Sequence, residues 1–150
     1  MKRFFAMIVV WAVLLCAVPF SAHATENNTT ITHFLDGSYL VTDIQVSNTR
    51  MLTKVGSKTD TYYSSDNVAQ WKMVITAEFL YDGTTCTCTY ASGITTIYNT
   101  SSWQKVFDRA SYSGSSATYT TRFNYSTLGI VVNSYEYSAV LTCDKNGNIS

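Results

Sequence analysis

The sequence predicts an all-β protein built as an antiparallel β-sandwich, with a small β-barrel as the alternative. Residues that favour strands dominate the chain, which has 11 Tyr and 7 Phe, and runs of strong helix formers are rare. Several segments alternate apolar and polar side chains with a period of two, as strands with one buried face do. Turn residues separate these segments at short intervals, which is typical of sandwiches and barrels.

The first residues have the pattern of a secretory signal peptide. Lys2 and Arg3 give a positive start, residues 4–18 are free of charge and mostly apolar, and Ala22–Ala24 supplies small residues for cleavage. The apolar run is shorter than the about 20 residues that span a bilayer. We therefore expect residues 1–24 to be removed on secretion, leaving no stable membrane anchor. The alternative is an uncleaved segment that tethers the domain to a membrane.

The rest of the chain is expected to form one domain. The polar stretch at 26–30 predicts a flexible lead-in over residues 25–36, followed by the β-sandwich domain over residues 37–150. Two of the ten Lys and Arg residues lie in the leader, which leaves eight against ten Asp and Glu. Because the remaining basic residues are scattered, we expect no binding to the phosphate backbone of a nucleic acid.

The predicted strands follow one another between turn signals. They lie near residues 38–46, 58–64, 68–81, 84–90, 94–98, 103–107, 117–125 and 131–143. The alternation is clearest over Val68–Tyr81, where the odd positions are apolar and the even positions include Lys72 and Glu78. The aspartates at 36, 82 and 144 stand between or after these segments and are expected to form turns.

Asp82-Gly83 predicts a β-hairpin with a two-residue type I′ turn. This register places Phe79 opposite Cys86 and Ala77 opposite Cys88. Three side chains of the second strand would then point into the core: Cys86, Cys88 and Tyr90. A longer turn would shift the register and could reverse these directions.

Three cysteines follow the leader. In an oxidising compartment, one disulfide with one thiol left over is expected. Ala77 would leave room across from Cys88, whereas Phe79 would crowd Cys86, so we expect a bridge from Cys88 to Cys143, with Cys86 as the alternative partner. In the chain-entropy model such a bridge stabilises the fold by about 4 kcal/mol.

The sequence has no combination of residues typical of an active site. It lacks a nucleophile elbow, a metalloprotease His-Glu pair and a phosphate-binding glycine loop. The spacing of its carboxylates does not indicate the pair that glycoside hydrolysis requires. A zinc site formed by His33 and the three cysteines is a weak alternative, because the gap between Cys86 and Cys88 is shorter than usual for zinc ligands. We expect neither catalysis nor a cofactor.

Aromatic side chains are the remaining candidates for function. The number of tyrosines exceeds what a core of this size needs, and exposed rings can stack on sugars or form a protein-contact patch. The candidate binding residues are Tyr39, Tyr62, Tyr63 and Tyr112. The alternative is that these tyrosines only pack on half-exposed strand surfaces.

Cys88, Trp103 and Cys143 follow the Cys–Trp–Cys order of immunoglobulin domains, which favours an immunoglobulin-like or related sandwich. Leu141, however, stands two positions before the last cysteine, where those domains have a tyrosine.

Further motifs extend over nearly the whole domain. They include Asp36-Gly37-Ser38-Tyr39, Thr61-Tyr62-Tyr63-Ser64, Tyr81-Asp82-Gly83, Cys88-Thr89, Tyr98-Asn99 and Leu141-Thr142-Cys143. With these motifs and its leader, the chain resembles a group of small secreted proteins of clostridia and related Gram-positive bacteria that have no assigned function. The resemblance implies a bridge between Cys88 and Cys143, and Cys86 is a departure from the pattern of those proteins. The resemblance implies no catalytic residue.

The sequence therefore predicts a secreted, non-catalytic protein. We expect an extracellular binding module whose ligand is a carbohydrate or a surface protein. The alternative is a secreted effector, such as an inhibitor or a bacteriocin-like protein, that makes contact through a loop or an edge strand.

Overall fold

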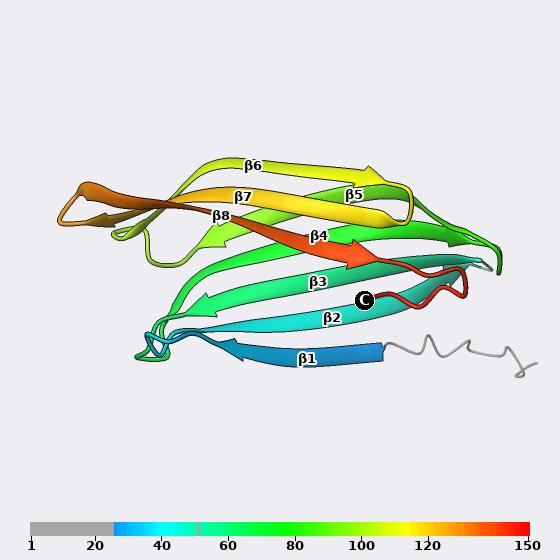
Figure 1. Cartoon of the computed structure of the whole chain (residues 1–150), viewed down its shortest axis with the longest axis horizontal. Helices are drawn as coiled ribbons and strands as arrows, with labels where there is room; N and C mark the ends of the chain where they lie inside the picture. The colour runs from blue at the N-terminus through cyan, green and yellow to red at the C-terminus, as the bar shows by residue number, and fades with distance from the viewer. Residues whose placement is uncertain (1–25, 51) are drawn as a thin grey trace, which may run out of the picture.

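The computed structural model describes residues 26–50 and 52–150, and these residues form two antiparallel sheets. The predicted signal peptide over residues 1–24 lies outside this part of the chain. The strands are β1 (Glu26–His33), β2 (Tyr39–Arg50), β3 (Thr53–Tyr63), β4 (Ala69–Tyr81), β5 (Cys86–Ile97), β6 (Trp103–Ser113), β7 (Ser116–Thr127) and β8 (Ile130–Thr142). The first five strands form one sheet and the last three form the other (Figure 1).

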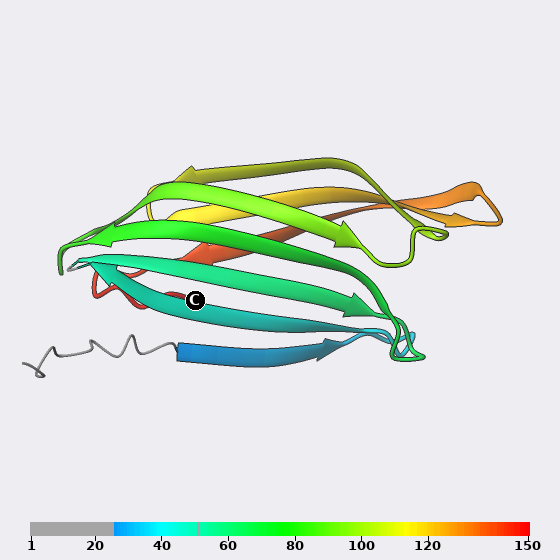
Figure 2. The same ribbon diagram turned by 180° about the vertical axis from the view of Figure 1, so that it is seen from behind.

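The two sheets lie face to face as separate layers, which confirms the β-sandwich and excludes a closed barrel for the described residues (Figures 1 and 2). Each strand pairs with its neighbour in the sequence, so both sheets are simple meanders. Immunoglobulin domains instead have Greek-key connections. The fold is therefore a related sandwich without the immunoglobulin strand order.

The core lies between β4 and the paired strands β7 and β8. The predicted alternation in β4 is confirmed, since its inward side chains are buried and its outward ones contact solvent. The core is formed largely by Trp71, Met73, Ile75, Ala77 and Phe79 from β4, Ala117, Tyr119 and Phe123 from β7, and Ala139 and Leu141 from β8. Full burial of one large apolar side chain contributes about 1.5–3 kcal/mol, so these residues hold the two layers together.

The predicted flexible lead-in is different in the structure, because residues 26–33 form the edge strand β1. This strand pairs with β2 along its whole length, from Glu26 opposite Val46 to His33 opposite Tyr39. Its side chains from 27 to 33 are exposed. Polar composition was a misleading signal here, because an edge strand is held by backbone hydrogen bonds and needs no apolar face.

The hairpin between β4 and β5 has a longer turn than the predicted two residues. Asp82 organises four residues by accepting hydrogen bonds from the backbone N–H groups of Thr84 at 2.8 Å and Thr85 at 2.7 Å. The register therefore shifts, and Tyr81 lies opposite Cys86 while Phe79 lies opposite Cys88.

The same strand pair contains an irregularity. A register shift between Glu78 and Phe79 reverses the side-chain direction in β5, so Tyr90 is 55% exposed and does not point into the core as predicted. Cys88, by contrast, is buried as predicted.

The C-terminal tail closes one end of the sandwich. Cys143 forms a β-bridge with Ile149, and the Ile149 side chain packs against Gly56 of β3. Gly147, which has a φ of +82°, lies against the ring of Tyr81 and leaves no room for a Cβ atom. The predicted turn at Asp144 is confirmed by its hydrogen bonds from the backbone N–H groups of residues 146 and 148.

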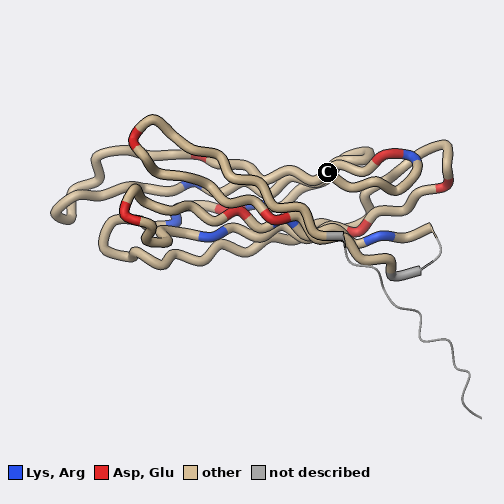
Figure 3. Tube along the Cα trace, turned by 90° about the horizontal axis from the view of Figure 1, so that it is seen from below, with Lys and Arg blue, Asp and Glu red and all other residues tan. Residues whose placement is uncertain are grey.

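Charged residues are scattered along the sandwich. Figure 3 shows acidic and basic positions spread over the length of the described chain, with no large block of either sign. At the end opposite the C-terminal tail, the β7–β8 hairpin projects beyond the other strands (Figure 1). The cavity between the sheets opens near this end.

Candidate functional site

A cavity of about 540 Å³ lies between the two sheets, where β3 and β7 end and β4 and β6 begin. Eight of its fifteen lining residues are aromatic. We call it the aromatic cleft. Its lining comprises Phe34, Asp36, Ser38, Leu40, Tyr62, Ser64, Ser65, Gln70, Trp71, Trp103, Phe123, Tyr125, Tyr135, Glu136 and Tyr137. A concave site rich in aromatic side chains with a few polar groups is the usual form of a small-ligand site.

Trp71 is the central ring of the aromatic cleft. It stacks on Phe123 with ring centroids 4.7 Å apart and on Tyr62 at 5.3 Å, so it joins rings from both sheets. Trp103 meets Trp71 edge-to-face at 6.4 Å and lies 5.0 Å from Tyr125. Such offset and edge-to-face pairs each contribute about 0.5–1.5 kcal/mol beyond area burial, which holds the rings in place before any ligand binds.

The connection between β5 and β6 positions Trp103. Its Asn99 side chain donates a hydrogen bond to Gln70 Oε1 at 2.8 Å, and the Gln70 carbonyl accepts the backbone N–H of Tyr98 at 2.9 Å. Trp103 N–H in turn donates to the Asn99 carbonyl at 2.9 Å. The start of β6 is thereby tied to the start of β4, and the two tryptophans are held in edge-to-face contact in the lining of one cavity.

Trp71 also carries a polar group without a partner. Its Nε1 is buried and makes no hydrogen bond within the described chain, although the residue is only 5% exposed. An unpaired buried donor costs about 1–3 kcal/mol. Trp71 lines the aromatic cleft, and its Nε1 is a donor that the described chain leaves unsatisfied.

Two carboxylates line the cleft, and they differ in their partners. Asp36 Oδ1 accepts hydrogen bonds from the Ser38 hydroxyl at 2.5 Å and from the Ser38 backbone N–H at 3.0 Å, which lower the pKa of Asp36. Glu136 forms an exposed ion pair with Arg122 at 2.8 Å. Both groups are therefore acceptors held near the mouth of the cavity.

A third carboxylate lies directly behind the lining. Asp60 is fully buried, and it accepts hydrogen bonds from the Thr42 hydroxyl and, at 3.3 Å, from the Tyr137 hydroxyl. Burial raises the pKa of Asp60, and burial together with the Asp60 charge raises that of Tyr137. This contact joins the two sheets and orients the Tyr137 ring at the cleft wall.

The structure brings one of the four predicted tyrosines into the cleft, and that residue is Tyr62. Tyr39 and Tyr63 stack on each other at 4.9 Å with nearly parallel rings, and neither lines the cavity. Tyr112 is 53% exposed near the end of β6, at the opposite end of the sandwich. The four residues therefore do not form one platform.

The sequence does not predict most of the aromatic cleft. The alternation in the strand places Trp71 on the core face, and Trp103 stands out only through the Cys–Trp–Cys order. One feature of the sequence does indicate the cleft, namely the place of the two tryptophans in their strands. Both stand at or near the start of a strand, so inward side chains at these positions lie at the end of the sandwich. The same applies to Tyr135 and Tyr137, which alternate toward the start of β8.

The three cysteines lie away from the cleft and carry free thiols in the structure. A bridge from Cys143 to Cys88, or to the alternative partner Cys86, stays a prediction. Phe79 and not the small Ala77 lies opposite Cys88, so the register no longer favours Cys88 over Cys86. Cys88 donates to the carbonyl of Tyr90 at 3.3 Å. The thiol that interacts with Cys143 is Cys86, which together with burial raises the pKa of Cys143 to about 12.

The described residues contain no group of three or more His, Cys, Asp or Glu side chains arranged to bind a metal ion. His33 lies beside Tyr39, with ring centroids 5.6 Å apart. These residues therefore do not form the zinc site that the sequence offered as a weak alternative.

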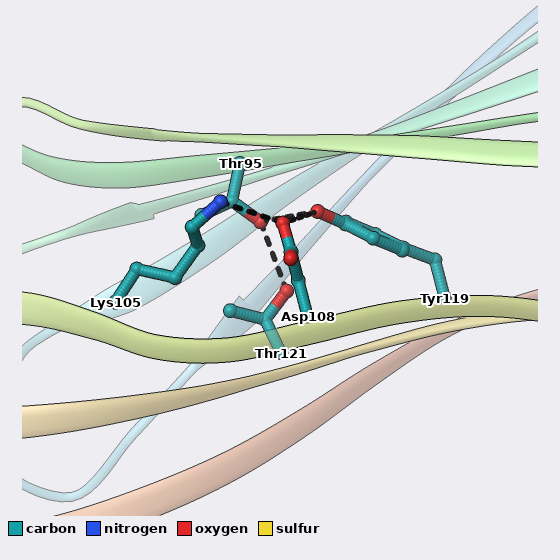
Figure 4. A network of polar contacts seen from close by, with 5 residues as sticks. All are labelled: Thr95, Lys105, Asp108, Tyr119 and Thr121. Carbon is teal, nitrogen blue, oxygen red and sulfur yellow. Dashed lines mark hydrogen bonds and ion pairs between the residues drawn. The ribbon is translucent and has the colours of Figure 1, made fainter.

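A second polar cluster lies at the seam between β5 and the three-stranded sheet (Figure 4). Tyr119 Oη donates to Asp108 at 2.8 Å and contacts the Thr95 hydroxyl at 2.9 Å, while Thr95 also contacts Thr121 at 2.9 Å. Lys105 pairs with Asp108 at 2.6 Å and lowers its pKa. The polar groups of this cluster satisfy one another, so it joins the sheets and offers little to a ligand.

No protein-family model, curated protein or solved structure matches this chain. Within the described residues, no helix has the length and apolar character needed to cross a membrane.

Proposed function

We propose that the protein is a secreted, non-catalytic binding module and that its aromatic cleft binds a carbohydrate. The observation that carries this proposal is the convergence of Tyr62, Trp71 and Trp103 in one cavity, together with the unpaired Nε1 of Trp71. Secretion is supported by the pattern of the leader over residues 1–24.

A sugar ring matches both the aromatic rings and the hydrogen-bonding groups of this lining. The apolar face of a pyranose can stack on an aromatic ring, while its hydroxyls both donate and accept hydrogen bonds. Asp36 and Glu136 supply acceptors, and the buried Nε1 of Trp71 is a donor left unpaired within the described chain. The rings are already packed against one another, so little conformational entropy is lost when a ligand binds.

The carboxylates favour binding over hydrolysis. A glycosidase needs one carboxyl with a raised pKa as general acid beside a second carboxylate. The pKa of Asp36 is lowered by Ser38, and Glu136 is ion-paired with Arg122. Asp60 has a raised pKa, but it is fully buried behind Tyr137. None of these groups is placed as a general acid.

A second candidate function is a secreted effector that binds a protein. It is favoured by the projecting β7–β8 hairpin, whose Leu128 is 98% exposed and is followed by the exposed Ile130, Val131 and Val132. Apolar side chains gathered at an exposed tip are typical of interaction sites. Growth inhibition of neighbouring bacteria that is lost on Ile130→Ser would support this candidate.

Intrinsic tryptophan fluorescence tests the carbohydrate proposal directly. Of the three tryptophans, Trp11 lies in the leader, and Trp71 and Trp103 line the cleft. Titration of the protein from culture supernatant with soluble oligosaccharides is expected to give a saturable change in emission. Removal of one stacking ring by Tyr62→Ala is expected to weaken binding by about 10-fold, from a loss of 1–2 kcal/mol.

Tyr112→Ala is the matched control, because it removes an exposed tyrosine at the far end of the sandwich. It should leave the titration unchanged. Equal weakening by both substitutions, or no saturable response to any oligosaccharide, would contradict the proposal. Turnover in a panel of hydrolase substrates would contradict its non-catalytic part.

A further inference from the structure

We infer that the carbohydrate bound in the aromatic cleft carries a positive charge, as an amino sugar with a free ammonium group does. This inference rests on the proposed function and narrows its ligand class. It follows from the charges and the rings that line the cavity.

The lining is acidic. Asp36 and Glu136 contribute to it, and no Lys or Arg is among its fifteen residues. An anionic sugar, such as a uronic acid, would meet the Asp36 carboxylate without a compensating cation in the wall, while Glu136 is already paired with Arg122. Like charges in a partly enclosed site repel, so the lining selects against anionic ligands.

Asp36 is the carboxylate best placed to attract an ammonium group. Its Oδ1 is held by Ser38, and the described chain donates no hydrogen bond to Oδ2. The lowered pKa keeps Asp36 ionised through the neutral and mildly acidic range. Glu136 contributes less, because Arg122 neutralises it on the solvent side.

The rings favour the same ligand. The face of an aromatic ring attracts a cation, and tryptophan does so most strongly. Trp71, Trp103 and Tyr62 lie within one cluster, with centroids 5.3–6.4 Å apart. Trp71 is 5% exposed and already stacked on Phe123 and Tyr62, so the half-buried Trp103 is the tryptophan that an ammonium group can approach. A ligand that places its ammonium group against Trp103 gains cation–π attraction as well as the field of Asp36, whereas a neutral sugar gains stacking alone.

Three oligosaccharides of equal length test the inference by fluorescence titration at mildly acidic pH. They are a glucosamine oligomer with free amines, the corresponding N-acetylglucosamine oligomer and a galacturonate oligomer. We expect the glucosamine oligomer to bind about fivefold or more tightly than the acetylated oligomer, and the galacturonate oligomer to bind weakest. Asp36→Asn should remove most of the preference for the free amine.

Asp82→Asn is the matched control for that substitution. Asp82 holds a turn through backbone N–H groups in the same way as Asp36, but at the other end of the sandwich. Asparagine retains this ability to accept hydrogen bonds in a turn, so both variants are expected to fold. The control should keep the full preference for the amine.

The possible outcomes separate the inference from the proposed function. If the acetylated oligomer binds as well as the amine, or if Asp36→Asn retains the preference, the charge inference is overturned and sugar binding stands. If none of the three oligomers binds, both fail. A preference for galacturonate would also overturn the inference.

Discussion

A methyl group added at Gly93 would test how tightly the two sheets are joined. Gly93 lies in β5 opposite Ile75, and its backbone is covered by the ring of Tyr119 from the other sheet. A Cβ atom at this position would lie 2.2 Å from Tyr119 Cδ2, 2.3 Å from Cγ and 2.5 Å from Cε2. Real Cβ atoms do not approach other carbons so closely, so Gly93→Ala must displace the ring or the strand.

Tyr119 cannot turn aside without loss. It is 2% exposed, and its hydroxyl is held by Asp108 and Thr95 at 2.8 and 2.9 Å. Overpacking of a core costs about 1–3 kcal/mol. Gly93 does not have a positive φ, so alanine would by itself stabilise the protein by about 0.4–1 kcal/mol through the unfolded state. Because three ring atoms lie within 2.5 Å of the new Cβ, we expect a clash cost at the upper end of this range, near about 3 kcal/mol, and a net destabilisation of about 2 kcal/mol.

Urea unfolding followed by tryptophan fluorescence measures this free energy. The same substitution made in a Tyr119→Ala background removes all three clashing ring atoms, so there Gly93→Ala should stabilise by about 0.4–1 kcal/mol. The change of sign between the two backgrounds is the signature of the contact. A Gly93→Ala variant as stable as its parent, or an equal effect in both backgrounds, would refute this account of the seam.

Two further predictions concern buried titratable groups. Because burial raises the pKa of Asp60, the native state holds its proton more tightly than the unfolded state, and the wild type should lose stability relative to Asp60→Asn as the pH rises above the usual value of 3.8. Urea unfolding at several pH values measures the difference, which should not be constant. In oxidised protein we expect Cys86 to bridge Cys143, so peptide mapping should find the link retained in Cys88→Ser and lost in Cys86→Ser; a Cys88–Cys143 peptide would contradict this.

The alternation in the sequence predicted the sandwich well because burial of one strand face is a local property. The inward faces of β4 and β7 follow from every second side chain. The register of the β4–β5 hairpin did not follow, because Asp82 can organise either a two-residue or a longer turn with the same local chemistry. The register shift between Glu78 and Phe79 then reverses the direction of the Tyr90 side chain. The strand propensities of these residues do not indicate where such a shift occurs.

The sequence by itself determined that this chain forms strands, which face of most of them is buried and where Asp36, Asp82 and Asp144 turn the chain. Only the tertiary structure decided that Trp71 and Trp103 meet in one cleft and that Tyr39, Tyr63 and Tyr112 stay outside it. The physical reason is that strand faces are set by neighbours along the chain, whereas a site between two sheets depends on how residues far apart in the chain are brought into contact.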